Sequence, residues 1–156
     1  MTKVLVVFVF ALSTVATACE RAPGPEFQIT EFYGSIKAQN PAAMRHAYRN
    51  LLSEATRDGL QRHADHLSGE SGGTIQPWDV LIFQQLLRGD RISKQEIVEQ
   101  TSDTARVKVH FAWYVPATDA EAKYRRPSPS PALVSLVKEG GQWRIHLPEL
   151  VAALGP

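Results

Sequence analysis

The side chains best suited to acid–base chemistry are the histidines, of which the 156-residue chain has five, because imidazole titrates near neutral pH. His110 and Tyr114 fall on the polar side of one segment with strand-like alternation, and Arg144 and His146 on that of another. If the two segments are neighbours in a sheet, these four side chains share one face and form a cluster that binds an anionic group or transfers protons. The alternative is that they belong to the solvated face of an antiparallel sheet.

Two further histidines have a spacing that metal sites use. His63 and His66 stand three residues apart, which puts both imidazoles on one face of a helix. A metal site needs a third ligand at a suitable position, and the sequence indicates none. The chain also has neither a glycine-rich phosphate loop nor the Ser-His-Asp order of a hydrolase. We therefore expect surface histidines, no metal and no cofactor.

The only cysteine, Cys19, follows a segment that resembles a secretory signal. Lys3 provides a positive start, residues 4–15 are almost continuously apolar, and residues 16–18 are small. The apolar run is about a dozen residues, shorter than the about 20 that span a bilayer. Small residues followed by cysteine resemble a bacterial lipobox, although leucine is commoner than Ala16 at its position. A lone cysteine in an oxidising compartment has no internal disulfide partner, which favours lipidation by acyl chains such as palmitate over a free or intermolecular thiol.

These features predict the domain order and the location of the protein. We expect a signal peptide at 1–18, a lipidated Cys19 with a Pro/Gly-rich tether at 19–25, and a single domain at 26–154. The residue after the cysteine is Glu20 and not an aspartate. In the lipoproteins that this start resembles, the absence of aspartate at this position favours the outer membrane. The predicted location is the bacterial cell envelope, on the periplasmic face of the outer membrane, with the lipid anchor as the attachment to the membrane.

The charge balance argues against nucleic acid as a partner. The chain has 17 basic and 16 acidic residues, and residues 1–18 contain one lysine and no acid, so 16 of each remain in the predicted mature chain. A nucleic-acid-binding protein draws its affinity from a basic face. A mature chain of 138 residues is long enough for one domain with its own core.

Periodicity predicts helices first and strands afterwards. Apolar residues recur at helical spacing in 29–36 and after Asn40-Pro41, with an end or bend at Asp58-Gly59 and a short helix at 60–67. Another helix begins at Pro77. Alternation then predicts strands at 92–100, 104–115, 132–139 and 142–147, with Gly140-Gly141 as a hairpin turn, and a short helix at 149–154. This order indicates an α+β domain whose N-terminal helices pack on a curved antiparallel sheet of about four strands.

Aromatic side chains on the inward-facing stripes are the better candidates for a binding pocket. Core packing accounts for most of them, and a pocket lined by some would suit a hydrophobic ligand. The candidate lining residues are Tyr33, Tyr48, Trp78, Phe111, Trp113 and Trp143.

Three segments together resemble one known superfamily. The stretches 32–40 (FYGSIKAQN) and 48–53 (YRNLLS) resemble the opening of nuclear transport factor two-like, or cystatin-like cone, domains, and 137–145 (VKEGGQWRI) is similar to their closing hairpin. The likeness covers about 26–147 and is closest to small bacterial lipoproteins of unknown function. It implies a cone in which helices and a curved sheet leave a pocket at the open end. Enzymatic members place an Asp, His or Tyr in that pocket, whereas this chain has no acidic residue on the inner faces of its two strongest predicted strands.

The sequence therefore favours a lipid-anchored, non-catalytic domain that binds a small apolar ligand or a protein partner. One alternative is an enzyme of the isomerase or dehydratase type that uses His110 or Tyr114 within the pocket. The other is an accessory protein for envelope assembly or secretion, which predicts an exposed apolar patch.

Overall fold

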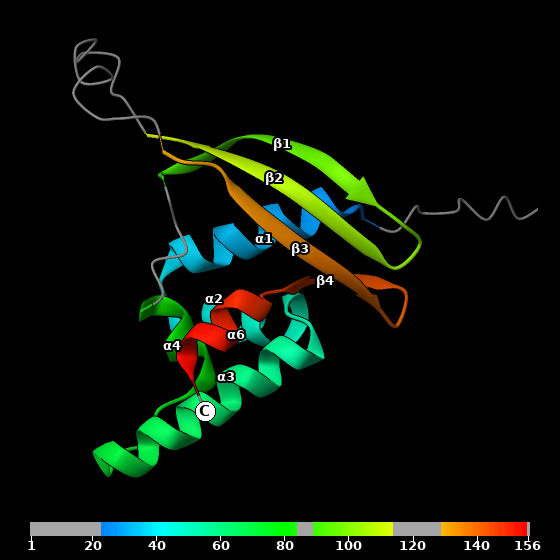
Figure 1. The fold of residues 1–156 in the computed structure, drawn as a ribbon. Helices are drawn as coiled ribbons and strands as arrows, with labels where there is room; N and C mark the ends of the chain where they lie inside the picture. The colour runs from blue at the N-terminus through cyan, green and yellow to red at the C-terminus, as the bar shows by residue number, and fades with distance from the viewer. Residues whose placement is uncertain (1–22, 84–88, 114–128, 156) are drawn as a thin grey trace, which may run out of the picture.

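The computed structural model describes residues 23–83, 89–113 and 129–155, except for the side chains of residues 82 and 83. Helices come first along the chain and an antiparallel sheet follows, which confirms the predicted α+β class (Figure 1). The described elements are α1 (Pro25–Ala38), α2 (Pro41–His46), the π-helical turn η1 (Ala47–Leu51), α3 (Glu54–Ser71), α4 (Pro77–Phe83), β1 (Arg91–Gln100), β2 (Thr104–Ala112), β3 (Ala132–Glu139), β4 (Gln142–His146) and α6 (Pro148–Leu154).

The sheet is a four-stranded antiparallel meander in the order β1-β2-β3-β4. Figure 1 shows it twisted, with α1 lying across one face and the other helices beyond α1. Strand β1 is irregular, because its register shifts between Ile92 and Lys94 and again between Ile97 and Glu99. The outer edge of β4 is covered by the chain itself, since Leu52 forms a parallel bridge with Ile145.

One part of the core lies between α1 and the sheet, and the same core continues through buried residues of α2, η1, α3 and α4. Val107 and Val109 of β2 and Ile145 of β4 have no exposed surface, and they alternate with half-buried or exposed neighbours. On the helix side, Ile29 and Phe32 are buried at helical spacing. The period-two and period-3.6 patterns of the sequence thus bury matching faces against each other.

The second and third helices differ from the prediction. Helix α2 runs into η1 and ends before Leu52, and α3 then continues without a break through Asp58-Gly59 to Ser71. Gly59 is required by a close approach, because a Cβ at that position would collide with the side chain of Val151 in α6. Gly59 therefore marks the contact between α3 and α6 and not the end of a helix.

Local turn and cap chemistry follows the sequence closely. Gly140 and Gly141 both have positive φ angles, 58° and 80°, as a two-residue type I′ hairpin turn requires. Asn40 caps α2 by accepting from the backbone N–H of Ala43 at 2.9 Å, and Pro41 occupies the first turn. Pro148 ends β4 and begins α6.

The predicted signal peptide and Cys19 lie outside the described residues. Within the described part of the chain, no helix is both long and apolar enough to cross a membrane.

Candidate functional site

An apolar cavity lies between the C-terminal half of α1 and the start of β1. Its volume is about 230 Å³. Apolar and aromatic side chains form most of its wall, and charged residues stand among them. The lining residues are Thr30, Tyr33, Gly34, Lys37, Gly89, Asp90, Arg91, Ile92 and Phe111. We call this space the α1–β1 cavity.

Two polar contacts hold α1 against β1 on either side of the cavity. Lys37 Nζ donates to the backbone oxygen of Asp90 at 2.5 Å, and Gln95 Nε2 donates to Thr30 Oγ1 at 2.8 Å. Since Lys37 is near the end of α1 and Asp90 is just before β1, the helix and the strand run antiparallel. The cavity occupies the space between these two contacts.

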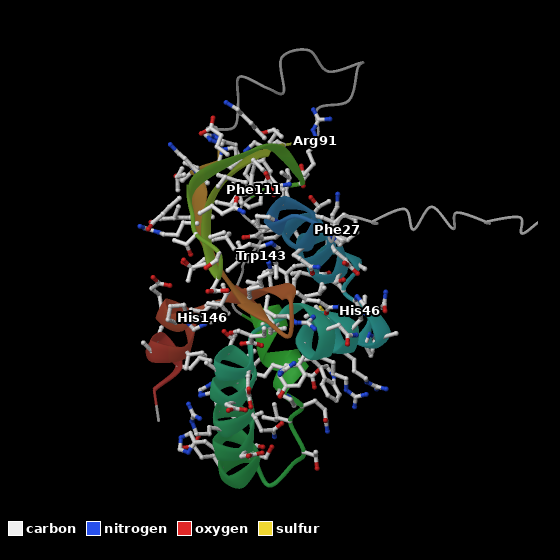
Figure 2. The ribbon with its side chains drawn as sticks, turned by 90° about the vertical axis from the view of Figure 1, so that its right-hand side faces the viewer. Phe27, His46, Arg91, Phe111, Trp143 and His146 are labelled. Atoms are coloured by element: carbon white, nitrogen blue, oxygen red, sulfur yellow. The ribbon has the colours of Figure 1, made fainter. Side chains whose placement is uncertain are left out.

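The floor of the cavity is a pair of aromatic rings. Tyr33 of α1 and Phe111 of β2 pack edge to face, with ring centroids 5.2 Å apart and an interplanar angle of 79°. Both side chains are largely buried. Figure 2 shows Phe111 under α1 on the inner side of the sheet, with Arg91 beyond it at the end of the sheet.

Two glycines leave the cavity open. A Cβ added at Gly34, in the middle of α1, would meet no heavy atom within 4 Å. Gly89 is different, because a Cβ there would lie 2.9 Å from Phe111 Cβ and 3.1 Å from the backbone oxygen of Ala112. Gly89 therefore lets the chain pass close over the end of β2, and Gly34 leaves one wall without a side chain.

The other predicted lining residues are placed elsewhere. Tyr48 and Trp78 pack against each other at 6.0 Å, with the guanidinium of Arg45 5.1 Å from the Trp78 ring. Burial raises the pKa of the Tyr48 hydroxyl, which donates to the backbone oxygen of Arg57. Trp143 lies under Lys138, whose Nζ is 5.5 Å from the ring centre. Trp113 is half-buried just after β2. Of the six aromatic candidates, the structure brings Tyr33 and Phe111 together at the cavity.

The structure does not bring His110 and His146 together. Strand β3 lies between β2 and β4, and His146 pairs with Ser135, which pairs with Arg106. Four residues along β2 at about 3.3 Å each and two strand spacings of about 4.8 Å put the two histidines roughly 16 Å apart. Both lie on the outer face of the sheet, because the alternate residues Val109, Phe111 and Ile145 face the core. Tyr114 lies outside the described residues.

Each described member of that predicted cluster has a local partner instead, namely His110, Arg144 and His146. His110 Nε2 lies 3.5 Å from Glu96 Oε2 on β1. Arg144 Nη2 donates to Gln142 Oε1 at 2.7 Å. A hydrogen bond of 3.0 Å joins His146 Nδ1 to Ser53 Oγ, which is fully buried at the start of α3. His146 therefore ties the last strand to a helix start.

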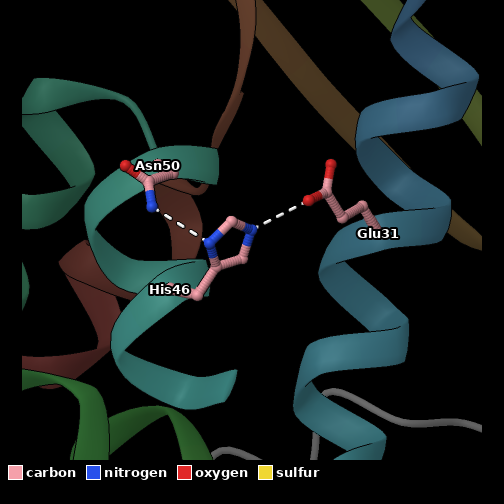
Figure 3. A network of polar contacts seen from close by, with 3 residues as sticks. All are labelled: Glu31, His46 and Asn50. Atoms are coloured by element: carbon pink, nitrogen blue, oxygen red, sulfur yellow. Dashed lines mark hydrogen bonds and ion pairs between the residues drawn. The ribbon is translucent and has the colours of Figure 1, made fainter. Parts of the chain in front are cut away.

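A polar network that the sequence did not reveal joins α1 to α2 and η1. His46 Nε2 lies 2.8 Å from Glu31 Oε1, and Asn50 Nδ2 donates to His46 Nδ1 at 3.0 Å (Figure 3). These three side chains, with Gln28 and Arg144, line a polar notch of about 220 Å³. The i, i+4 spacing of His46 and Asn50 is visible in the sequence, but Glu31 comes from another helix. Exposed fractions of 44% and 35% for His46 and Glu31 place this hydrogen bond at the surface.

The described residues contain no group of three or more His, Cys, Asp or Glu side chains that could hold a metal ion. His66 instead pairs with Glu70 one turn along α3, with Nε2 and Oε1 3.4 Å apart.

Comparison with protein-family models, with curated proteins and with solved structures finds no match to this chain. A function must therefore be inferred from the geometry of the chain itself.

Proposed function

We propose that this protein is a non-catalytic binding domain that takes a small apolar ligand into the α1–β1 cavity. The observation that carries the proposal is a space of about 230 Å³ walled by Tyr33, Ile92 and Phe111 and left open by the missing side chain at Gly34. Binding pockets are typically concave and mostly apolar, with a few polar groups. An apolar cavity of about 150 Å³ is enough to bind benzene in another protein, so this volume suits a small ligand.

The arrangement of polar groups favours binding over catalysis. The isomerase or dehydratase alternative needs His110 or Tyr114 inside the pocket, and His110 lies on the outer face of the sheet, away from the α1–β1 cavity. Tyr114 lies outside the described residues. The accessory-protein alternative needs a continuous exposed apolar patch. Among the described residues, the exposed large apolar side chains come from α1, β1 and β3: Phe27, Ile97, Val98 and Leu133.

We also propose a membrane-anchored cone domain of the nuclear transport factor two-like type. The order of helices and strands and the hairpin at Gly140-Gly141 support the family. The lipobox-like residues before Cys19 support a lipid anchor at the periplasmic face of the outer membrane. Radioactive palmitate fed to bacteria that express the full chain should label it, and the Cys19→Ser variant should stay unlabelled. An intact mass that fits an unmodified Cys19 would remove the anchor.

Ligand binding can be tested with n-octanol as the probe, followed by amide chemical shifts in the NMR spectrum. The expected shift changes are confined to residues 30–37, 89–92 and 111. Gly34→Leu places a side chain over the cavity and should weaken binding at least tenfold. Gly69→Leu is the matched control, because Gly69 is also a helix glycine whose added Cβ meets nothing within 4 Å. Equal binding by the two variants would contradict the proposed function.

A further inference from the structure

We infer that the ligand of the α1–β1 cavity is an amphiphile with a singly charged acidic head, of the type of a medium-chain fatty acid. This inference rests on the proposed function and deepens it, since it names the chemical class that the cavity would select.

The first observation is the charge around the cavity. Among the lining residues that the structure describes, Lys37, Arg91 and Asp90 carry a formal charge, and their charges sum to plus one. A head group with one negative charge balances that charge, whereas a cationic head would be repelled. A head with two negative charges would exceed it.

The second observation is that, within the described part of the chain, no carboxylate forms an ion pair with Lys37 or Arg91. Among the described residues, the exposed guanidinium of Arg91 makes no hydrogen bond or ion pair. Lys37 Nζ donates to a backbone oxygen, that of Asp90, which is polar but uncharged. Figure 2 shows the Arg91 side chain at the end of the sheet, beyond Phe111. An arginine at this position offers a planar pair of N–H donors that matches a carboxylate in two parallel hydrogen bonds.

The third observation is the size and polarity of the interior. With roughly 30 Å³ for each water-sized group, the cavity of about 230 Å³ holds about seven or eight methylene-sized groups. The Tyr33 and Phe111 rings and Ile92 give these groups an apolar surface. A tail of this length that lies against the rings places its head at the rim, where Lys37 and Arg91 stand.

The test compares probes that share one tail and differ in the head. Octanoate, n-octanol and octylamine are titrated into the full-length protein at pH 7. Calorimetry measures the affinity of each probe, and NMR chemical shifts locate its binding site. We expect octanoate to bind at least tenfold more tightly than n-octanol, and octylamine to bind most weakly. Higher salt should weaken octanoate binding and leave n-octanol binding unchanged, because only the first depends on charge.

A variant at Arg91 separates the contribution of the head group to the affinity from that of the tail. Arg91→Gln should weaken octanoate at least fivefold without changing the affinity for n-octanol. Arg62→Gln, which removes an exposed arginine from α3 far along the chain from the cavity, serves as the control and should change neither affinity.

The outcomes distinguish this inference from the proposed function. If n-octanol and octanoate bind equally well, or Arg91→Gln has no effect, the inference of an acidic head group is wrong, and the proposed apolar binding site remains. If octyl phosphate binds more tightly than octanoate, the singly charged head is wrong. If acetate binds as well as octanoate, the cations alone bind anions and the cavity contributes nothing. If no eight-carbon probe binds, or Gly34→Leu leaves binding unchanged, the proposed function fails as well.

Discussion

At the scale of single residues, two glycines in helix interiors stand in opposite surroundings: Gly59 has no room for a side chain, and Gly34 has open space beside it. A glycine inside a helix costs about 0.5–1 kcal/mol relative to alanine, because it loses more backbone freedom on folding. At Gly59 the cost is offset by the contact with Val151, which leaves no room for a Cβ. At Gly34 nothing occupies the space. The structure gives no packing reason for Gly34, which supports the proposal that a ligand uses the space.

The two glycines should therefore respond oppositely to alanine. Gly34→Ala should raise the free energy of unfolding by about 0.5–1 kcal/mol. Gly59→Ala should lower it by about 1–3 kcal/mol, as overpacked positions do. Urea unfolding measures both. In a Val151→Ala background the cost of Gly59→Ala should shrink, and an unchanged cost would show that the collision with Val151 is not its cause.

Ser53 is a buried helix cap with more partners than a cap usually has. Its Oγ accepts from the backbone N–H of Thr56 at 3.3 Å, donates to Thr56 Oγ1 at 2.9 Å and bonds to His146 Nδ1. Thr56 Oγ1 in turn accepts from the backbone N–H of Leu147 at 3.0 Å. The start of α3 and the end of β4 are thereby fastened to each other.

Removal of this hydroxyl should cost more than removal of an exposed cap. We expect Ser53→Ala to lower the free energy of unfolding by about 2 kcal/mol, the upper end for helix caps, because it leaves buried donors without a partner. Asn40→Ala at the exposed start of α2 should cost about 1 kcal/mol. Denaturant unfolding of the two variants compares them, and equal costs would mean that the buried network adds nothing.

Glu96 offers a prediction on pH. A hydrogen bond from Lys94, followed by the charge of that lysine, lowers the pKa of the Glu96 carboxyl below its ordinary value, and His110 adds to this in the same direction. A lowered folded pKa means that the favourable contribution is present above the ordinary glutamate pKa and is lost as pH falls through the folded value. NMR titration should show a low midpoint for Glu96. The midpoint should rise in Lys94→Gln, and no rise would exclude Lys94 as the cause.

At the scale of elements, periodicity predicted much of the fold because α1, β2, β3 and β4 each bury one regular face. Most of β1 is exposed without regular alternation, so its burial does not follow a period of two. The helix at 29–36 and the strands β2 and β3 follow from local pattern alone. The break at Leu52-Ser53 does not, because it depends on the bridge between Leu52 and Ile145, more than ninety residues away. Ser53 is a local signal for the start of α3, because serine is a preferred helix cap, but no local pattern encodes the bridge to the distant strand.

The candidate site was predictable only in part, for the same reason. The apolar periodicity of their segments predicts that Tyr33 and Phe111 face inward. The contact between the two rings results from the packing of α1 on β2. The roles of Gly34, Lys37 and Arg91 depend on how α1 lies along β1, which no pattern in either segment encodes. The predicted pairing of His110 with His146 required adjacent strands, and β3 separates them.

Sheet topology predicts how the elements should open. Strands β2 and β3 each have a strand on both sides, whereas β1 has one described strand neighbour and two register shifts. Amide hydrogen exchange should therefore be slowest in Val107, Val109 and Leu136 and markedly faster in the outward amides of β1. Uniform protection across the four strands would contradict this order.

At the scale of the whole molecule, the cavity and the point where the described chain begins lie at opposite ends of α1. The chain enters the domain at Pro23, which lies with Thr101 and Gly141 around one hollow of the surface. Helix α1 has 14 residues, or about 21 Å at about 1.5 Å per residue, and the cavity lies along its second half. If Cys19 holds the lipid, the anchor joins the domain at the end of α1 that lies farther from the cavity.

The two edges of the sheet also differ in their capacity to recruit another polypeptide. The β4 edge is occupied by Leu52 and Ser53 of the same chain, whose backbone bonds with Ile145 leave no room for an added strand. The β1 edge has two register shifts together with Lys94, Glu96 and Glu99, features that discourage intermolecular strand pairing. If Cys19 anchors the protein to a membrane, neighbouring copies would collide often, and unprotected sheet edges would let them pair. Its sheet is protected against fibrillar polymerisation on one side by its own backbone and on the other by irregularity and charge.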